Sequence, residues 1–366
     1  MCKPRRRKQK KQVKPELKLR QFAATELSDQ LAVQPAADLP RFMVDTVAGA
    51  YAPTDAELMI EGFGAAATRP VTLRANTLKA TAEDIVAALD AAGIAHQTVT
   101  WYPDAFILPE AQVSDLWDLD IYRDGKIYLQ SLSSMMPPLV LGAQAGEDIL
   151  DMCAAPGGKT TQIAALTQGQ AHLTACEMSI PRAEKLESNL HRQGAKNVPV
   201  MRIDARELDE FFHFDRILLD APCTGTGTVI SGNEKSLRGL TEQLLSKCAR
   251  SQRALLDRAM GALKPGGTLV YSTCSILPQE NEDALQEALD KHMDCELIPL
   301  DGTPSESEAR RAQETGEEPR IESNALTEAI AAGQISAIAN GLPGTLTIPP
   351  SRDFEGFYIA LIRKRS

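Results

Sequence analysis

Two cysteines stand at positions where a side chain could take part in covalent chemistry. Cys223 and Cys274 each follow a short apolar run that is typical of a buried strand. A thiolate is a strong nucleophile and can form a covalent intermediate with a ligand. Most cysteines are instead small apolar core residues, an interpretation that fits Cys176, Cys248 and Cys295 better than the two cysteines at strand ends.

A turn rich in small residues follows the first predicted strand of the same region. It consists of Cys153, Ala154, Ala155, Pro156, Gly157, Gly158 and Lys159. Its glycines let the backbone turn tightly, which brings N–H groups and a helix N-terminus close to a ligand. The turn lacks the G-x-G-x-x-G spacing of dinucleotide sites, and a cysteine stands where a phosphate loop has its first glycine. We interpret it as a ligand-binding turn of another kind rather than a plain strand-to-helix connection.

Three acidic residues end successive predicted strands beside this turn, namely Glu177, Asp204 and Asp220. A carboxylate in the place of Glu177 can accept hydrogen bonds from both ribose hydroxyls, and Asp204 is placed to face an adenine edge. One acid at a strand end is more often a helix N-cap. Three in one sheet, next to the glycine turn, favour an adenosyl cofactor.

Strands and helices alternate from Gly146 onward, and this order predicts the sheet that holds these residues. Regular alternation implies a parallel sheet with helices on both faces, so the predicted fold class is α/β and Rossmann-like. The predicted strand cores are residues 149–150, 173–175, 198–200, 217–219 and 269–270, with one further strand at 356–362. The clearest predicted helices cover residues 159–166, 181–193 and 244–263, the last ending at a Lys-Pro-Gly-Gly sequence, residues 264–267. We expect a mobile insertion near 302–340.

The region before Gly146 predicts a small α+β module, ferredoxin-like or similar to an RNA-recognition domain. Its predicted elements are short helices within 25–63 (one at 39–51), a strand at 71–75, a capped helix at 81–92, a strand at 98–108 interrupted at Pro103, and a connecting segment at 125–138. The predicted parts of the chain are therefore a basic disordered arm (1–24), the N-terminal helices and module (25–140), and the α/β domain (141–366).

Composition excludes several classes of protein. The apolar runs are too short to cross a bilayer, and the basic N-terminus is followed by no apolar stretch of a secretory signal. Seven cysteines without a C-x-x-C pair or a histidine cluster argue against a disulfide frame and a zinc site. We expect no metal, no membrane association, a cytoplasmic location and a monomer.

Basic side chains are concentrated at the N-terminus. Residues 1–20 hold ten Lys and Arg against one acid, whereas the rest of the chain carries a net charge of −19. A basic arm on an acidic body suits contact with a polyanion. It equally suits a disordered, solubilising leader.

The sequence resembles the RsmB/Nop/Sun-type RNA cytosine-5 methyltransferases, which depend on S-adenosylmethionine. The resemblance covers roughly residues 70–275 and resumes at 350–357. It lies in the segments Asp151 to Thr160, Asp220 to Gly225, Ser272-Thr273-Cys274 with Pro278-Gln279-Glu280-Asn281, Arg74 to Lys79, and Tyr128 to Ser134. It implies a class I methyltransferase sheet, with the N-terminal module binding RNA.

The resemblance also implies a role for each site residue. Cys274 would attack carbon 6 of cytosine so that carbon 5 can take the methyl group, and Cys223 would assist release of the product. Asp220 would contact the cytosine ring, with Lys159 near the target. The backbone of residues 153–159, with Glu177, Asp204 and Asp220, would hold the cofactor, and Arg182 would line the same pocket.

Departures from the family's pattern are small, and several readings of the function stay open. Glu177 stands where many relatives have Asp, and Thr224 replaces a common Ser. The module before Gly146, and the arm, would have to select the target, which we expect to be ribosomal RNA. Alternatives are a tRNA cytosine-5 methyltransferase, a non-catalytic RNA-binding ribosome-assembly factor, a DNA methyltransferase attacking through Cys223, and a small-molecule methyltransferase.

Overall fold

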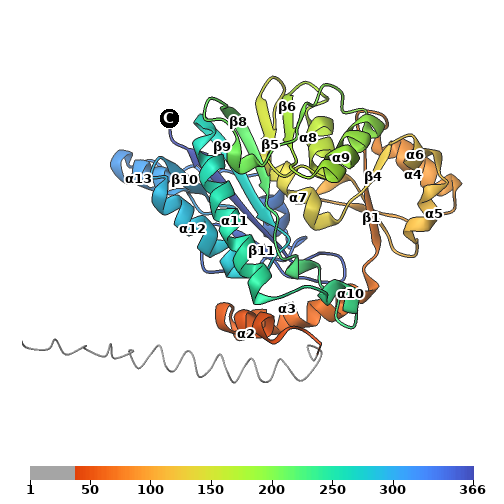
Figure 1. Ribbon diagram of the computed structural model, residues 1–366, viewed down its shortest axis with the longest axis horizontal. Helices are drawn as coiled ribbons and strands as arrows, with labels where there is room; N and C mark the ends of the chain where they lie inside the picture. The colour runs from red at the N-terminus through yellow and green to blue at the C-terminus, as the bar shows by residue number, and fades with distance from the viewer. Residues whose placement is uncertain (1–37) are drawn as a thin grey trace, which may run out of the picture.

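A four-stranded sheet and an eight-stranded sheet organise the chain (Figure 1). The computed structural model describes residues 38–366. The predicted basic arm, residues 1–24, and the first residues of the predicted N-terminal helices lie outside that range.

Two helices precede the first sheet and pack beneath the second one. They are α2 (Arg41–Ala50) and α3 (Pro53–Ala65), followed by the short turn η1 (Ala66–Thr68). Their apolar faces contact Ile276 and Leu277, which directly follow the Cys274 segment. The Tyr51 hydroxyl donates to the carbonyl of Ile276 at 2.8 Å, so the helices support that segment from below.

The first sheet is antiparallel and has the strand order β2-β3-β1-β4. Its elements are β1 (Val71–Ala75), α4 (Ala82–Ala91), β2 (Gln97–Val99), β3 (Tyr102–Leu108), α5 (Val113–Trp117), α6 (Asp120–Arg123) and β4 (Ile127–Leu129). Thr81 caps α4 with a capping box, as predicted from the sequence. The predicted interruption at Pro103 is wrong, because the chain turns at residues 100–101 and Pro103 lies within β3.

The segment predicted to be a connection, residues 125–138, contains strand β4 and the start of helix α7 (Leu132–Leu141). Two prolines, Pro137 and Pro138, lie inside α7. Pro138 has no N–H to donate to the carbonyl of Ser134. The side-chain amide of Gln130 donates to that carbonyl instead, at 3.0 Å, and the Ser131 hydroxyl caps the first turn.

The second sheet begins with parallel strands, and helices cover both of its faces. Its elements are β5 (Asp148–Asp151), α8 (Gly158–Leu166), β6 (His172–Cys176), α9 (Ile180–Gln193), β7 (Val200–Met201), η2 (Ala205–Glu207), β8 (Phe214–Asp220), η3 (Thr226–Thr228), α10 (Glu234–Leu237), α11 (Glu242–Gly261), β9 (Leu263–Thr273), η4 (Pro278–Glu280), α12 (Glu282–Lys291), β10 (Cys295–Ile298), α13 (Glu306–Thr315), α14 (Ala325–Ala331), β11 (Leu346–Ile348) and β12 (Phe357–Lys364). The strand order is β10-β12-β9-β8-β5-β6-β7, and β12 runs antiparallel to its neighbours β9, β10 and β11.

Alternate residues of the central strands fill two cores, one on each face of this sheet. Leu218 of β8 joins α7, α8 and α9 in one core, while its neighbours Ile217 and Leu219 join α11 and α12 in the other. Both faces are apolar because both are covered, as expected for parallel strands. The predicted Rossmann-like α/β class is confirmed.

Two details of this domain differ from the prediction. The Lys-Pro-Gly-Gly sequence, residues 264–267, does not end a helix but lies within β9, where the pairing with β8 shifts register. The segment 302–340, predicted to be a mobile insertion, contains the helices α13 and α14, which the sequence analysis did not predict. Ser305 and Asn324 cap them, and Leu326 of α14 is buried in the core.

Candidate active site

The turn between β5 and α8 lies so close to its neighbours that its two glycines leave little room for a side chain. Gly157 has a φ of 106°, a left-handed conformation that favours glycine, and a Cβ at Gly158 would lie 3.1 Å from the Tyr128 ring. No side chain caps α8. The first N–H groups of this helix therefore keep their capacity to bind a ligand.

Asp151 ends β5 at the base of this turn and is 1% exposed. Its Oδ2 accepts a hydrogen bond from Thr160 at 2.7 Å, whereas its Oδ1 has no partner. Burial raises the pKa of Asp151 to about 6. A buried acceptor without a partner is costly, so Asp151 is placed to receive a donor from a bound molecule.

The predicted cofactor acids lie around a cavity at the carboxyl ends of β6 and β7. Glu177, Arg182 and Asp204 all line it, as does Cys153 of the turn. The buried Glu177 carboxylate pairs with Arg182 at 3.2 Å, and Arg182 also donates to the carbonyl of Ala155 at 2.9 Å. Arg182 thus ties the carboxylate to the glycine turn.

Asp204 is a helix N-cap, the usual role of an acid at a strand end. Its Oδ1 accepts from the backbone N–H of Arg206 at 3.0 Å, and the Arg206 side chain pairs with the same carboxylate. These hydrogen bonds from Arg206 hold the pKa of Asp204 below its usual value. Asp204 therefore caps η2 and lines the cavity at the same time.

Cys223 and Cys274, the two cysteines predicted to take part in the reaction, lie next to each other. The Sγ atoms of Cys223 and Cys274 lie 3.2 Å apart, and both thiols are free. The contact with Cys274, together with burial, raises the pKa of Cys223 well above its usual value. Either thiol can donate to the other across this contact.

Two buried polar residues hold the cysteine segments in place, and both lie in the Pro278–Asn281 motif. Glu280 accepts from the backbone N–H of Thr224 at 2.8 Å and from its hydroxyl at 2.5 Å. Asn281 accepts from the Thr273 hydroxyl at 2.5 Å and donates to the carbonyl of Ser275 at 2.9 Å. In the sequence analysis this motif appeared only as part of the family resemblance, and its contacts explain why both residues are polar and buried.

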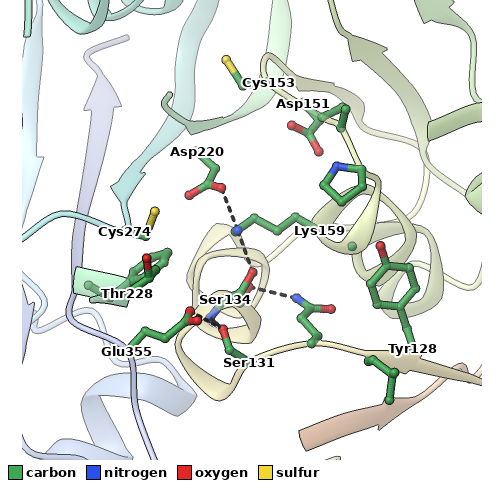
Figure 2. Close-up of a pocket in the computed structure, with 17 residues that line it drawn as sticks. Tyr128, Ser131, Ser134, Asp151, Cys153, Lys159, Asp220, Thr228, Cys274 and Glu355 are labelled. Atoms are coloured by element: carbon green, nitrogen blue, oxygen red, sulfur yellow. Dashed lines mark hydrogen bonds and ion pairs between the residues drawn. The ribbon is translucent and has the colours of Figure 1, made fainter. Parts of the chain in front are cut away.

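Lys159 and Asp220 form a partly buried ion pair beside Cys274 (Figure 2). Lys159 Nζ lies 2.7 Å from both Asp220 Oδ2 and Ser134 Oγ, and 5.6 Å from the centre of the Phe357 ring. Burial opposes the charge on Lys159, but the Asp220 carboxylate outweighs it and raises the pKa of Lys159. Asp220 also accepts from the Ser272 hydroxyl at 2.9 Å.

A cavity of about 330 Å³ joins these groups. Cys274, Lys159, Asp220 and Asp151 line it, together with the glycine turn. Cys223 does not line the cavity itself but contacts Cys274, which does. Several further lining residues had no site role in the sequence analysis, and the polar ones that other elements bring in include Ser131, Ser134, Thr228 and Glu355.

Within residues 38–366, no group of three or more His, Cys, Asp or Glu side chains is arranged to hold a metal ion. No helix in that range is long and apolar enough to span a membrane.

The strand order, the reversed strand β12 and the glycine turn after the first parallel strand define a Rossmann-like methyltransferase fold with an added ferredoxin-like domain. The chain belongs to the 16S rRNA methyltransferase RsmB/F family, whose model matches residues 138–363. A model of the ferredoxin-like domain of RsmF/B-like methyltransferases matches residues 39–114. The family resemblance inferred from the motifs is confirmed.

Named relatives agree with this assignment. The chain is 40% identical over 249 residues to ribosomal RNA small subunit methyltransferase F of Aeromonas salmonicida, covering 66% of this chain and 52% of that protein. It is 35% identical over 318 residues to the protein of the same name from Vibrio parahaemolyticus, covering 84% and 60%. The chain thus spans little more than half the length of these relatives. A solved structure of a methyltransferase homologue from Pyrococcus horikoshii is similar over 96% of this chain and all of that one, with a TM-score of 0.69 and 29% identity.

Proposed function

We propose that this protein transfers a methyl group from S-adenosylmethionine to carbon 5 of a cytosine in ribosomal RNA. The observation that carries the proposal is the pairing of Cys223 with Cys274 beside the Lys159–Asp220 ion pair. The names of the relatives support ribosomal RNA as the target. A tRNA target is the alternative. A cytoplasmic location and a monomeric state are part of the same proposal.

The residues present fit the cofactor. The uncapped first turn of α8 and the backbone of residues 153–159 would hold its amino-acid part, where the orphaned Oδ1 of Asp151 suits an ammonium donor. Glu177 would bind the ribose hydroxyls, and Asp204 with Arg182 would line the adenosine end. When bound, S-adenosylmethionine supplies an electrophilic methyl group.

The site residues then have distinct roles in the reaction. The Cys274 thiolate forms a bond to carbon 6 of cytosine, which makes carbon 5 nucleophilic enough to take the methyl group. Lys159 offsets negative charge near the thiolate, and Asp220 contacts the ring during activation. A base then removes the carbon 5 proton, the sulfur–carbon 6 bond breaks, and Cys223 assists that release.

The assignment of the nucleophile separates this proposal from a DNA-type mechanism, in which the cysteine after the proline, Cys223, would attack. Cys274 lines the cavity and Cys223 does not, which supports Cys274 as the attacking group. A scaffolding protein or a small-molecule methyltransferase would have no use for two adjacent free cysteines, one of which lines a cavity beside a partly buried lysine.

The first prediction concerns covalent trapping. Cys223→Ala keeps the nucleophile and loses the residue that assists release, so we expect a protein–RNA adduct that survives denaturing gel electrophoresis. Cys274→Ala is expected to form no adduct and to transfer no methyl group, a loss of at least about 10³-fold for a missing nucleophile. The measurement uses total RNA with S-adenosylmethionine labelled in the methyl group.

Cys248→Ala is the matched control, because Cys248 lies on α11 outside the cavity and should leave both readouts unchanged. The reverse pattern, with adducts in Cys274→Ala, would assign the attack to Cys223. Separating the labelled RNA into ribosomal and transfer fractions then distinguishes the two targets.

A further inference from the structure

Glu355 contributes a carboxylate to the cavity that the reaction described above does not use. It lies in the segment 350–357, which the structure fastens at several points. The Arg69 guanidinium donates to the carbonyls of Ser351 and Phe354 at 3.0 and 2.9 Å. The Ser133 hydroxyl donates to the carbonyl of Glu355 itself at 2.9 Å. Glu355 is therefore held in a fixed place at the junction of the two sheets.

The Glu355 carboxylate is only half satisfied. Its Oε2 accepts a hydrogen bond from Ser131 Oγ at 2.7 Å (Figure 2). Its Oε1 makes no hydrogen bond, and no cation lies within ion-pair distance of it among the residues that the structure describes. Ser131 thus orients the carboxylate and leaves one oxygen to accept from a molecule in the cavity.

Glu355 and Ser131 lie at the end of the cavity away from Asp151 and Cys153, with Lys159 between the two ends (Figure 2). The methyl donor belongs at the Cys153 end, so carbon 5 of a bound cytosine must point there. Carbon 2, with its oxygen, is the ring atom opposite carbon 5, and the amino group on carbon 4 is a direct neighbour of carbon 5. The end of the cavity at Glu355 therefore faces the carbon 2 oxygen and the ribose on nitrogen 1.

A carboxylate can only accept, so it repels the carbon 2 oxygen and requires a donor. The ribose 2′-hydroxyl is the donor at that end of a cytidine, and it is the group that distinguishes RNA from DNA. We infer that Glu355, oriented by Ser131, accepts a hydrogen bond from the 2′-hydroxyl of the target cytidine and so selects RNA. This inference rests on the proposed function and adds the residue that recognises the sugar.

The test compares two 16S rRNA transcripts, one made with ordinary cytidine and one with 2′-fluorocytidine, which cannot donate at the 2′ position. Single-turnover methyl transfer is measured for the wild-type protein and for variants. The wild type should be slower on the fluoro transcript by roughly 10- to 100-fold, the range for a hydrogen bond to a charged group. In Glu355→Ala the two rates should agree within about twofold. Because each ratio is taken within one variant, a partly folded sample does not alter it.

Two further variants sharpen the test. Glu355→Gln keeps an acceptor oxygen without the charge, and Ser131→Ala frees the carboxylate, so both should give intermediate ratios. Asp353→Ala is the matched control, since it removes a carboxylate from the same segment outside the cavity and should keep the wild-type ratio. The inference is overturned if Glu355→Ala slows both transcripts equally and keeps the wild-type ratio, or if the wild type does not distinguish them. A wild-type protein inactive on the ordinary transcript would contradict the proposed function itself.

Discussion

Asp151 and Asp220 end neighbouring strands of one sheet, yet their surroundings give them different properties. Asp220 has a cation at 2.7 Å, while Asp151 is buried and accepts a hydrogen bond from the Thr160 hydroxyl. Burial therefore dominates at Asp151 and raises its pKa to about 6. Because the folded-state pKa exceeds the ordinary carboxyl value, the protonated acid is favoured on folding. The resulting stability is lost as the pH rises from about 4 through 6.

The second prediction follows for cofactor affinity. If the ionised Asp151 receives the cofactor's ammonium group, binding must release the proton below pH 6. The affinity for S-adenosylhomocysteine should then rise with pH from 5 to 6, by up to about tenfold per unit, and level off above 6. Asp151→Asn should weaken binding at pH 7 by roughly 10- to 100-fold and abolish the pH dependence. Isothermal titration calorimetry measures both.

Asp148→Asn is the control for this prediction, because Asp148 lies at the opposite end of β5 and pairs with Lys264 at 2.7 Å. It should keep the wild-type affinity and pH profile. An unchanged pH profile in Asp151→Asn would show that another group is titrating.

Among single residues, those that belong to a recognisable local motif could be predicted from the sequence. The glycine turn, Glu177 and the two cysteines could be found because each follows a strand end, and parallel strand ends meet at one edge of the sheet. Lys159 depended on the family resemblance, since a lysine at a helix start is usually solvated. Glu355 lay in a segment that resembles the family, but its place in the site could not be predicted, because only the reversed strand β12 brings that segment back to the cavity.

At the scale of elements, two glycines allow the Cys223 segment and the segment before β12 to touch. The Gly356 N–H donates to the carbonyl of Gly227 at 2.8 Å, and a Cβ on Gly227 would lie 1.9 Å from the Gly356 carbonyl oxygen. Backbone atoms cannot yield as a side chain can. This contact therefore sets the distance between the cysteine pair and the segment that carries Glu355.

The third prediction is that Gly227→Ala separates these segments. We expect a loss of about 2–4 kcal/mol in the free energy of unfolding and at least about 10²-fold in methyl transfer, because small displacements of reacting groups are costly. Chemical denaturation and the labelled-methyl assay measure the two effects. Gly64→Ala on α3 is the control, since its Cβ would meet nothing within 4 Å, and it should be neutral or stabilising. Equal activities in Gly227→Ala and Gly64→Ala would contradict the idea that the Gly227–Gly356 contact sets the distance between the cysteine pair and the Glu355 segment.

Helices and strands could be predicted from the sequence where apolar periodicity and helix caps are clear. They could be predicted less well where tertiary contacts decide the local structure. The alternation after Gly146 gave the strands and helices of the Rossmann-like sheet. Helix α7 was missed because its prolines oppose a helix locally, and the compensating donor, Gln130, is recognisable only in three dimensions. The antiparallel position of β12 between β9 and β10 could not be predicted either, since the pattern of residues in a strand does not show in which direction it runs in the sheet.

At the scale of the whole molecule, Arg74 joins the two sheets. It lies on β1 of the first sheet and is fully buried. Its guanidinium donates to Gln130 at 2.9 Å, to the carbonyl of Gly158 at 3.0 Å, and to Thr161 at 2.7 Å. The last two belong to α8 at the glycine turn. A residue of the N-terminal module thus supports the turn that would hold the cofactor.

The fourth prediction tests this link between the sheets. Arg74→Met keeps much of the buried volume but leaves the Gly158 carbonyl and the Gln130 amide oxygen without this donor. Each unsatisfied buried acceptor costs about 1–3 kcal/mol, so we expect the free energy of unfolding to fall by about 2–4 kcal/mol. We also expect weaker cofactor binding, because α8 is then held less firmly. Arg123→Met is the control, because Arg123 pairs with Asp120 on the surface and should change stability by less than about 0.5 kcal/mol. If Arg74→Met unfolds earlier but binds S-adenosylhomocysteine as tightly as the wild type, Arg74 stabilises the interface without supporting the turn. If both quantities fall together, the N-terminal module is a structural part of the cofactor site.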